Sequence, residues 1–258
     1  MTASASLILT GLPGIPEIQP GDDLAAIVGD AIARTAQSPR AGDVIVIAQK
    51  IFSKAENRFV VLGTVVPSAR AHALAEKTGK DPRIVELILS ESHAVLRTRK
   101  NVLVVEHRLG MVLASAGIDQ SNIGPDREGR ERALLLPLDP DGSCRLMRDR
   151  LMTRFGVEMG VIMNDSIGRA WRNGIVGTAI GVAGVPALVD RRGAPDRFGR
   201  KLEITMIGVA DEIAAAASIL MGQADEGTPA VHIRGVPYGR RDASVRELIR
   251  ARDEDLFR

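Results

Sequence analysis

Short apolar runs alternate with amphipathic stretches along this chain, which is the pattern of a protein that mixes helices and strands. The run 44–48 (VIVIA) is entirely apolar and rich in β-branched residues, so it predicts a strand buried on both faces. In 24–36, apolar residues recur at helical spacing. By the same reasoning we expect helices at 24–36, 69–78, 82–91, 143–155, 213–221 and 244–257, and strands at 6–10, 44–48, 95–98, 102–106, 159–163, 201–208 and 229–234.

This alternation predicts an α/β protein with mixed sheets. A chain of 258 residues can form one large domain or two small ones, and no stretch has the composition of a linker. We therefore treat 1–258 as a single unit that can have two lobes. Gly79-Lys80 is followed by Asp81 and lacks the preceding glycine of a phosphate-binding Walker loop, which predicts a fold outside the P-loop class.

Charge and composition exclude several classes of protein. The chain has 34 basic and 32 acidic residues, and only 3% of its residues are aromatic, which argues against nucleic-acid binding. It has no apolar stretch of about 20 residues for a membrane span and no signal-peptide pattern. Its single cysteine, Cys144, rules out an intrachain disulfide. These features predict a cytoplasmic protein that does not bind membranes.

The stretch 159–184 carries the strongest chemical signal. A predicted strand ends on Asn164, Asp165 and Ser166, and a glycine-containing turn leads to Arg169 and Arg172. A carboxylate can bind a cation, arginines can bind phosphate oxygens, and glycines let the backbone approach a ligand. The alternative interpretation is a buried strand that enters an ordinary polar loop.

A second acid, Asp119, also follows an apolar segment, and it could share a divalent cation such as Mg²⁺ or Mn²⁺ with Asp165. Lys50 and Lys54 follow the buried strand 44–48 in a polar stretch that suits phosphate binding or is simply a solvated loop. The residues alone favour an enzyme acting on phosphate with a metal. A metal-dependent phosphotransferase or phosphatase and a non-catalytic nucleotide-binding protein remain as alternatives.

Several segments, taken together in order and spacing, resemble the coenzyme F420:L-glutamate ligase family in its stand-alone form. They are 14–18 (GIPEI), 20–24 (PGDDL), 53–56 (SKAE), 116–119 (AGID) with 121–122 (SN), 136–143 (LPLDPDGS), 165–169 (DSIGR), 172 with 174–177 (GIVG), 209–214 (VADEIA) and 220–222 (LMG).

The resemblance implies a fold, an activity and a set of ligands. The family fold is a two-lobed ligase fold that forms an intertwined homodimer. The family activity adds L-glutamate through γ-linked amide bonds to the 5-deazaflavin precursor of coenzyme F420, with GTP as substrate, two Mg²⁺ or Mn²⁺ ions and a response to K⁺. The chain is expected to lack the C-terminal flavin-binding domain of some bacterial relatives.

The resemblance also implies roles for individual residues. Asp119, Asp165 and Ser166 would bind metal, and Lys54, with Arg169 and Arg172 as anion clamps, would serve catalysis. The nucleotide would contact Ile15, Pro16, Glu17, Ile18, Gln49, Lys54, Asn122, Met221, Gly222 and Gln223. Three positions depart from the family pattern: Gln49 replaces a small hydroxyl residue, Ser166 a threonine and Ser115 an asparagine.

Overall fold

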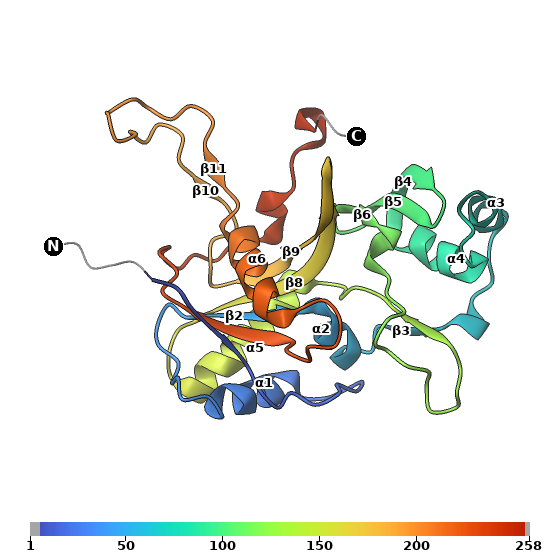
Figure 1. The fold of residues 1–258 in the computed structure, drawn as a ribbon, viewed down its shortest axis with the longest axis horizontal. Coiled ribbons are helices and arrows are strands. Elements are labelled where there is room, and N and C mark those ends of the chain that lie inside the picture. Colours follow the sequence, from blue (N-terminus) through green and yellow to red (C-terminus); the bar gives the residue numbers. More distant parts are fainter. Residues whose placement is uncertain (1–5, 256–258) are drawn as a thin grey trace.

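A five-stranded mixed sheet forms the centre of the molecule (Figure 1). The computed structural model describes residues 6–255. Along the sheet the strands are β1 (Ile8–Gly11), β12 (Ala230–Arg234), β2 (Val44–Ala48), β8 (Gly160–Arg169) and β9 (Arg172–Ala183). β2 and β8 pair in parallel, and the other neighbours are antiparallel.

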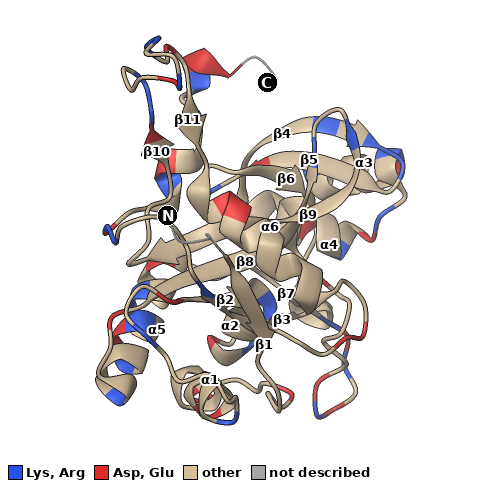
Figure 2. Ribbon diagram, turned by 60° about the vertical axis from the view of Figure 1, so that its left-hand side comes forward, with Lys and Arg blue, Asp and Glu red and all other residues tan. Residues whose placement is uncertain are grey.

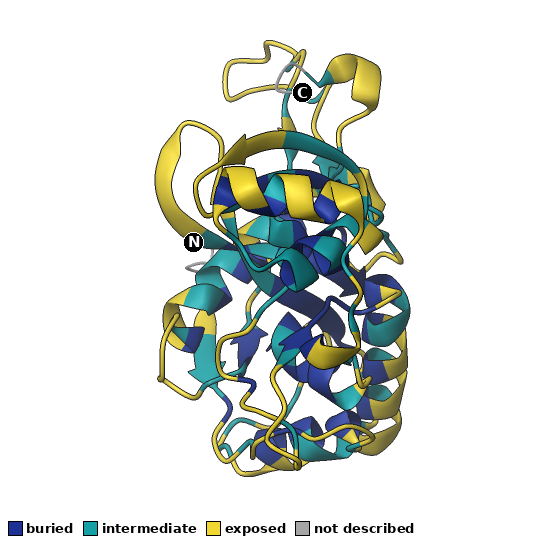
Figure 3. Ribbon diagram, turned by 90° about the vertical axis from the view of Figure 1, so that its right-hand side faces the viewer, coloured by how far each residue is buried: buried dark blue, intermediate teal, exposed yellow. Residues whose placement is uncertain are grey.

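Helices cover both faces of this sheet, because its central strands are apolar on both sides. One face packs against α1 (Leu24–Ala33) and α5 (Pro140–Phe155), and the other packs against α6 (Val209–Met221). Within β2, Ile45 and Ile47 join the core under α1 and α5, whereas Val44 and Val46 join the core under α6. This alternation is the two-residue period of a strand. Figure 3 shows the buried interior and the exposed outer surfaces.

Glycines let β9 lie unusually close to its two neighbouring helices. A Cβ atom added at Gly177 would lie 2.6 Å from the carbonyl oxygen of Ala214 on α6. One added at Gly181 would lie 2.6 Å from the carbonyl oxygen of Pro140 on α5. Both contacts are with backbone, which cannot move as a side chain can. These two glycines therefore allow helices to pack closely against both faces of β9.

The segment between the second and eighth strands carries a smaller set of elements with its own core. It contains α2 (Gln49–Ala55), β3 (Phe59–Val61), α3 (Ala69–Thr78), α4 (Pro82–Ser90), β4 (Ser92–Arg99), β5 (Val102–His107), β6 (Val112–Ala114) and β7 (Arg132–Leu134). β4, β5 and β6 form one antiparallel sheet, and β3 pairs with β7. Val85, Ile88, Leu103 and Val105 are completely buried in this core.

A buried carboxylate links this smaller set of elements to the rest of the molecule. Glu91, just after α4, accepts hydrogen bonds from Arg108 at 2.9 Å and from Arg58 at 3.3 Å. Arg58 also donates to the carbonyl oxygen of Leu136, ahead of α5. Burial raises the pKa of Glu91, but hydrogen bonds from His107 and Arg108 and the charges of both arginines outweigh it and lower that pKa to about 2.

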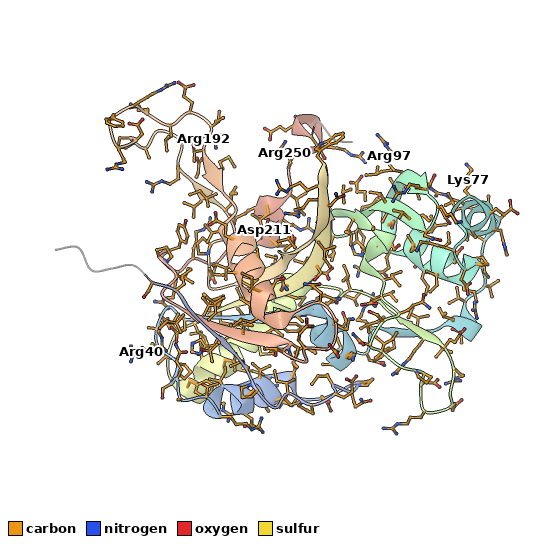
Figure 4. All side chains as sticks on the ribbon, viewed as in Figure 1. Arg40, Lys77, Arg97, Arg192, Asp211 and Arg250 are labelled. Carbon is orange, nitrogen blue, oxygen red and sulfur yellow. The ribbon has the colours of Figure 1, made fainter. Side chains whose placement is uncertain are left out.

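Two segments near the C-terminal end differ in how they meet the compact body: one projects from it and the other packs against it. The arm, residues 189–207, begins with β10 (Val189–Asp190), ends with β11 (Met206–Ile207) and projects away from the sheet (Figures 1 and 4). The tail, residues 235–255, does not form the expected helix, and it contacts the start of α5. Asp141 of α5 accepts hydrogen bonds from the Ser244 hydroxyl at 2.7 Å and from the Val245 amide at 3.3 Å.

Most of the predicted elements are confirmed in position, but several differ in extent or type. The helix expected over 213–221 begins at Val209, and the strand expected over 95–98 extends over Ser92–Arg99. The helix expected to start at Ser143 begins at Pro140, because Asp139 caps it by accepting from the Gly142 amide at 3.0 Å. The strand expected over 201–208 is limited to β11. The tail forms only short 3₁₀ turns, Val245–Leu248 and Arg252–Glu254, in place of a helix over 244–257, of which 256–257 lie outside the described residues.

Surface charge is mixed in sign. Figure 2 shows lysine and arginine interspersed with aspartate and glutamate over the loops and outer helices. In the described part of the chain, no helix combines the length and apolar character needed to cross a bilayer.

Candidate functional site

A cavity of about 800 Å³ opens at the carboxyl end of β2, beside the middle of β8. The parallel register places Ala48 opposite Asn164, so the residues that follow each of them meet there. Five segments line most of the cavity: 15–18, 48–54, 113–122, 164–168 and 221–229. Strand ends in α/β sheets commonly form ligand sites of this kind.

Every residue assigned above to nucleotide or metal binding lines this one cavity. These residues are Ile15, Pro16, Glu17, Ile18, Gln49, Lys54, Asp119, Asn122, Asp165, Ser166, Met221, Gly222 and Gln223. They come from segments up to about two hundred residues apart in the chain. Their roles toward a ligand stay predictions, but the residues required for those roles share one space.

Arg169 and Arg172 lie elsewhere. They are paired in register at the turn between β8 and β9, where both are exposed, and neither lines the cavity. Arg169 donates to the carbonyl oxygen of Asn173 at 3.3 Å. Their proposed role as anion clamps stays a prediction, and it requires a ligand that extends beyond the cavity along the hairpin.

The path of β8 differs from the expected one. The strand was predicted over 159–163, with Asn164, Asp165 and Ser166 at its end, but it continues to Arg169 and turns directly into β9. A register shift between Met163 and Asn164 marks a bulge in the pairing with β9. Bulges redirect side chains, and this one occurs where β8 passes from core residues to the polar residues of the cavity.

Hydrogen bonds from β8 hold the loop after α6 against the cavity. The Ser166 hydroxyl donates to the Gln223 side-chain oxygen at 2.7 Å, and the buried Asn164 amide donates to the Met221 sulfur at 3.3 Å. The side-chain oxygen of Asn164 is buried without a hydrogen-bond partner among the described residues. The predicted metal and nucleotide residues of β8 and 221–223 are therefore directly joined.

The polar stretch after β2, expected as a loop, is the short helix α2. Lys50 and Lys54 are four residues apart and so share one face of it. Lys50 forms an ion pair with Asp119 at 2.6 Å and donates to the Ser121 carbonyl oxygen at 3.1 Å. Lys54 is buried, pairs with Glu17, and donates to the Asn122 carbonyl oxygen at 2.9 Å.

The two carboxylates of the site have opposite pKa shifts. Burial raises the pKa of Asp165 to about 6, and the nearby negative charge of Asp119 raises it further, against a hydrogen bond from the Ser166 amide. Burial also raises the pKa of Asp119, but hydrogen bonds from Lys50 and Ser121 prevail and lower it overall. A cation placed between the two carboxylates would offset both the desolvation cost of the buried charge and the repulsion between the two groups.

The donor atoms fit a hard divalent cation. Asp119 and Asp165 supply carboxylate oxygens, Ser166 a hydroxyl and Gln223 an amide oxygen, which are the ligands that Mg²⁺ and Mn²⁺ prefer. Within residues 6–255, no group of three or more His, Cys, Asp and Glu side chains is arranged to hold a metal. Mg²⁺ commonly binds through one or two carboxylates, with substrate phosphates and water completing its shell.

Sequence reasoning assigned no ligand role to Ser121 or Asn164, and it gave Lys50 only a general candidacy for phosphate binding; all three line the cavity. The four-residue spacing of Lys50 and Lys54 was available as a signal, but it has meaning only on a helix. Ser121 follows Asp119 by two residues, which is the spacing of an aspartate turn, and its amide donates to Asp119 at 2.7 Å.

Comparison with known proteins gives a consistent picture. Residues 14–235 match the family model described as F420-0:gamma-glutamyl ligase. Among curated relatives, the coenzyme F420:L-glutamate ligase of Methanothermobacter thermautotrophicus is 46% identical over 252 residues, covering 97% of this chain and 98% of that protein. The protein of the same name from Methanopyrus kandleri is 46% identical over 248 residues, covering 94% of each chain.

A third relative carries the same name. The coenzyme F420:L-glutamate ligase of Archaeoglobus fulgidus is 42% identical over 246 residues, covering 95% of this chain and 94% of that protein. The family model extends over the smaller set of elements, every segment of the cavity and all strands of the central sheet except β1. The chain belongs to the F420-0:gamma-glutamyl ligase family.

Proposed function

We propose that this protein is a ligase that uses GTP to join L-glutamate, through γ-linked amide bonds, to the 5-deazaflavin precursor of coenzyme F420. The observation that carries the proposal is the single cavity lined by all the residues assigned to nucleotide and metal. The family and the names of its curated members support the ligase reaction and its two substrates.

The proposed chemistry proceeds through an acyl phosphate. The acceptor carboxylate attacks the γ-phosphorus of GTP, the bond from that phosphorus to the bridging oxygen breaks, and GDP leaves. The amine of glutamate then attacks the carbonyl carbon of the acyl phosphate. Inorganic phosphate departs and the amine loses a proton, which leaves the amide. Phosphoryl transfer of this kind depends mainly on positioning and on neutralisation of charge.

The residues of the cavity supply that positioning. Lys54 is buried and pinned between Glu17 and the 119–122 loop, so its ammonium has a fixed place beside incoming phosphates. Asp119, Asp165 and Ser166 would hold the divalent cations. Such ions, when bound, neutralise the charge that develops on the transferred phosphoryl group. Segment 15–18 and Asn122 would contact the nucleotide.

The family resemblance extends the proposal to two lobes, a homodimer and a response to K⁺. Exposed apolar side chains support the homodimer: Phe198 and Ile204 on the arm and Ile219 on α6 are each at least 80% exposed. A second copy of the chain that covered them would remove this apolar surface from water.

The decisive experiment is mass spectrometry of the deazaflavin precursor after incubation with protein, GTP, Mn²⁺ and L-glutamate. We expect products heavier by one or more glutamate residues, with one GDP formed for each residue added. Omission of glutamate serves as the control and should leave the precursor unchanged.

Two other outcomes would contradict the proposal. GTP consumption with no change in the precursor would instead indicate the metal-dependent phosphotransferase or phosphatase. Tight GTP binding without turnover would indicate a non-catalytic nucleotide-binding protein. Replacement of GTP by ATP in the same assay tests the choice of nucleotide.

A further inference from the structure

Lys50 and Lys54 differ both in how far their side chains are exposed and in the carboxylate that each one pairs with. The Lys54 side chain is only 5% exposed, whereas that of Lys50 is 24% exposed at the mouth of the cavity. The partner of Lys50 is Asp119, the carboxylate assigned to a metal. A cationic side chain therefore lies where a metal cation is expected to bind.

Both oxygens of Asp119 are engaged. Oδ1 accepts from the Ser121 amide and from the Ser121 hydroxyl, each at 2.7 Å. Oδ2 contacts the Lys50 ammonium at 2.6 Å. Because Ser121 binds through neighbouring backbone, Oδ1 is fixed locally. Oδ2 becomes available to a metal only when the Lys50 ammonium moves away from it.

We propose that Lys50 is an exchangeable counter-cation for Asp119, which gives up this carboxylate when a divalent cation and nucleotide bind and moves its ammonium to a phosphate oxygen. This inference rests on the proposed nucleotide and metal function of the cavity. It assigns to Lys50 a positioning role that is separate from that of the pinned Lys54.

The charges of the cavity supply the reason for the exchange. With both carboxylates ionised, Asp119, Asp165 and Lys50 sum to −1, and a divalent cation alone would bring the group to +1. The Lys50 ammonium would then be left without an anion close to a like charge. A polyphosphate supplies the missing anion within reach of the flexible lysine stem. Lys50 should therefore make metal binding weak alone and strong with nucleotide.

The test is a Lys50→Met variant, which keeps the length of the side chain and removes its charge. Binding of Mn²⁺ is followed by the electron paramagnetic resonance signal of free Mn²⁺, with and without GDP. Without nucleotide, we expect the variant to bind Mn²⁺ at least about fivefold more tightly than the wild type. The factor by which GDP tightens Mn²⁺ binding should fall by at least about fivefold.

Two matched variants accompany the measurement. Lys50→Arg keeps the positive charge and should keep the strengthening of Mn²⁺ binding by GDP. Lys77→Met removes a lysine from the outer helix α3, remote from the cavity (Figure 4), and should behave as the wild type. Circular dichroism and thermal unfolding check that each variant is folded.

The outcomes separate this inference from the proposed function. If Lys50 only holds the 119–122 loop in place, Lys50→Met weakens Mn²⁺ binding both with and without GDP, and the exchange is overturned. Unchanged Mn²⁺ binding in Lys50→Met also overturns it. If the wild type itself fails to bind Mn²⁺ in the presence of GDP, the nucleotide and metal function fails, and the exchange fails with it.

Discussion

At the scale of single residues, the cavity contains two aspartates in different electrostatic environments. Asp119 has a lysine and a hydroxyl as partners, which keep it ionised. Asp165 has one backbone amide, and burial raises its pKa to about 6. A carboxylate held in this unfavourable state gains more from a bound cation than one that is already paired. Of the two aspartates, Asp165 therefore has the negative charge that the folded protein stabilises less.

Replacement of Asp165 by Asn should separate activity from stability. Turnover should be abolished, a loss of at least about a hundredfold, because the proposed phosphoryl-transfer site would lose a charged metal ligand. Without divalent ions at pH 7, the free energy of unfolding should rise by about 1–3 kcal/mol. Both quantities are measurable, by the glutamate-addition assay and by urea unfolding.

The extra stability of Asp165→Asn should depend on pH in a definite direction. The raised pKa of Asp165 means that the native protein holds more protons than the unfolded chain between pH 3.8 and about 6. The advantage of Asp165→Asn should thus be absent below pH 3.8, grow up to about pH 6 and stay constant above it. Asp149→Asn, at an exposed position on α5, serves as the control. Full activity in Asp165→Asn would contradict the metal assignment.

The acids at two strand ends, together with the resemblance to the family, named in advance most of the polar residues that line the cavity. The motifs 165–169 and 116–119 name carboxylates whose place in the cavity agrees with their proposed role. The pairing of Lys50 with Asp119 could not be predicted, because it joins positions 69 residues apart. Ion pairs across such separations depend on the completed fold.

At the scale of elements, β9 packs closely against helices on both of its faces. Its glycines fit between α5 and α6 at distances that exclude a side chain, as the contacts of Gly177 and Gly181 show. The strand forms a long hairpin with β8, whose polar half lines the cavity. Any displacement of β9 therefore moves the carboxylate of Asp165.

Gly181→Ala should destabilise the protein by about 1–3 kcal/mol, because the added methyl group meets the backbone of Pro140 and forces β9 away from α5. Urea unfolding measures the loss. Gly168→Ala is the matched control, since a Cβ there meets nothing within 4 Å on the same hairpin. Equal stability of the two variants would show that the contact between β9 and α5 yields easily.

Sequence patterns predicted elements well where burial repeats regularly. β2 was predicted with its observed bounds, and so was α3, because a continuous apolar run and a helical period are local signals. The helix α2 was missed because it follows β2 without a loop and has no side chain that caps its start. The hairpin of β8 and β9 was missed because its strands continue through polar residues.

At the scale of the whole molecule, the cavity lies between the central sheet and the smaller set of elements. Asp165 comes from the sheet, and Asp119 comes from the segment after β6. The distance between them depends on how firmly the two parts are joined. Glu91, with its arginine partners Arg58 and Arg108, is one of the buried links at this junction.

Glu91→Gln should lower the free energy of unfolding by about 3 kcal/mol at pH 7, because two arginines lose their shared anion. The pKa of Glu91 is depressed from 4.5 to about 2, so its contribution is present above pH 4.5 and is lost as the pH falls through 2. The difference between variant and wild type should shrink over that range.

Urea unfolding at pH 7 and at pH 3 measures this difference. Glu76→Gln on the exposed side of α3 is the control and should match the wild type at both pH values. A constant difference for Glu91→Gln across the pH range would indicate lost packing instead of lost charge.

The mixed α/β architecture followed from the alternation of patterns along the chain, but the order of strands in the sheet did not. Pairing of β1 with β12 joins Ile8 to Arg234, which no local pattern encodes. The parallel register of β2 and β8, which creates the cavity, likewise arises from the assembly of distant segments.

The position of β12 also constrains how the protein can be made. This strand lies between β1 and β2, so β1 has no partner in the sheet until residues 230–234 have been synthesised. The cavity likewise needs the loop 221–229. Contacts between such distant segments slow folding. Synthesis must therefore pass residue 234 before both the sheet and the cavity can form, and a translation product interrupted earlier would lack the cavity and would expose unpaired strands to aggregation.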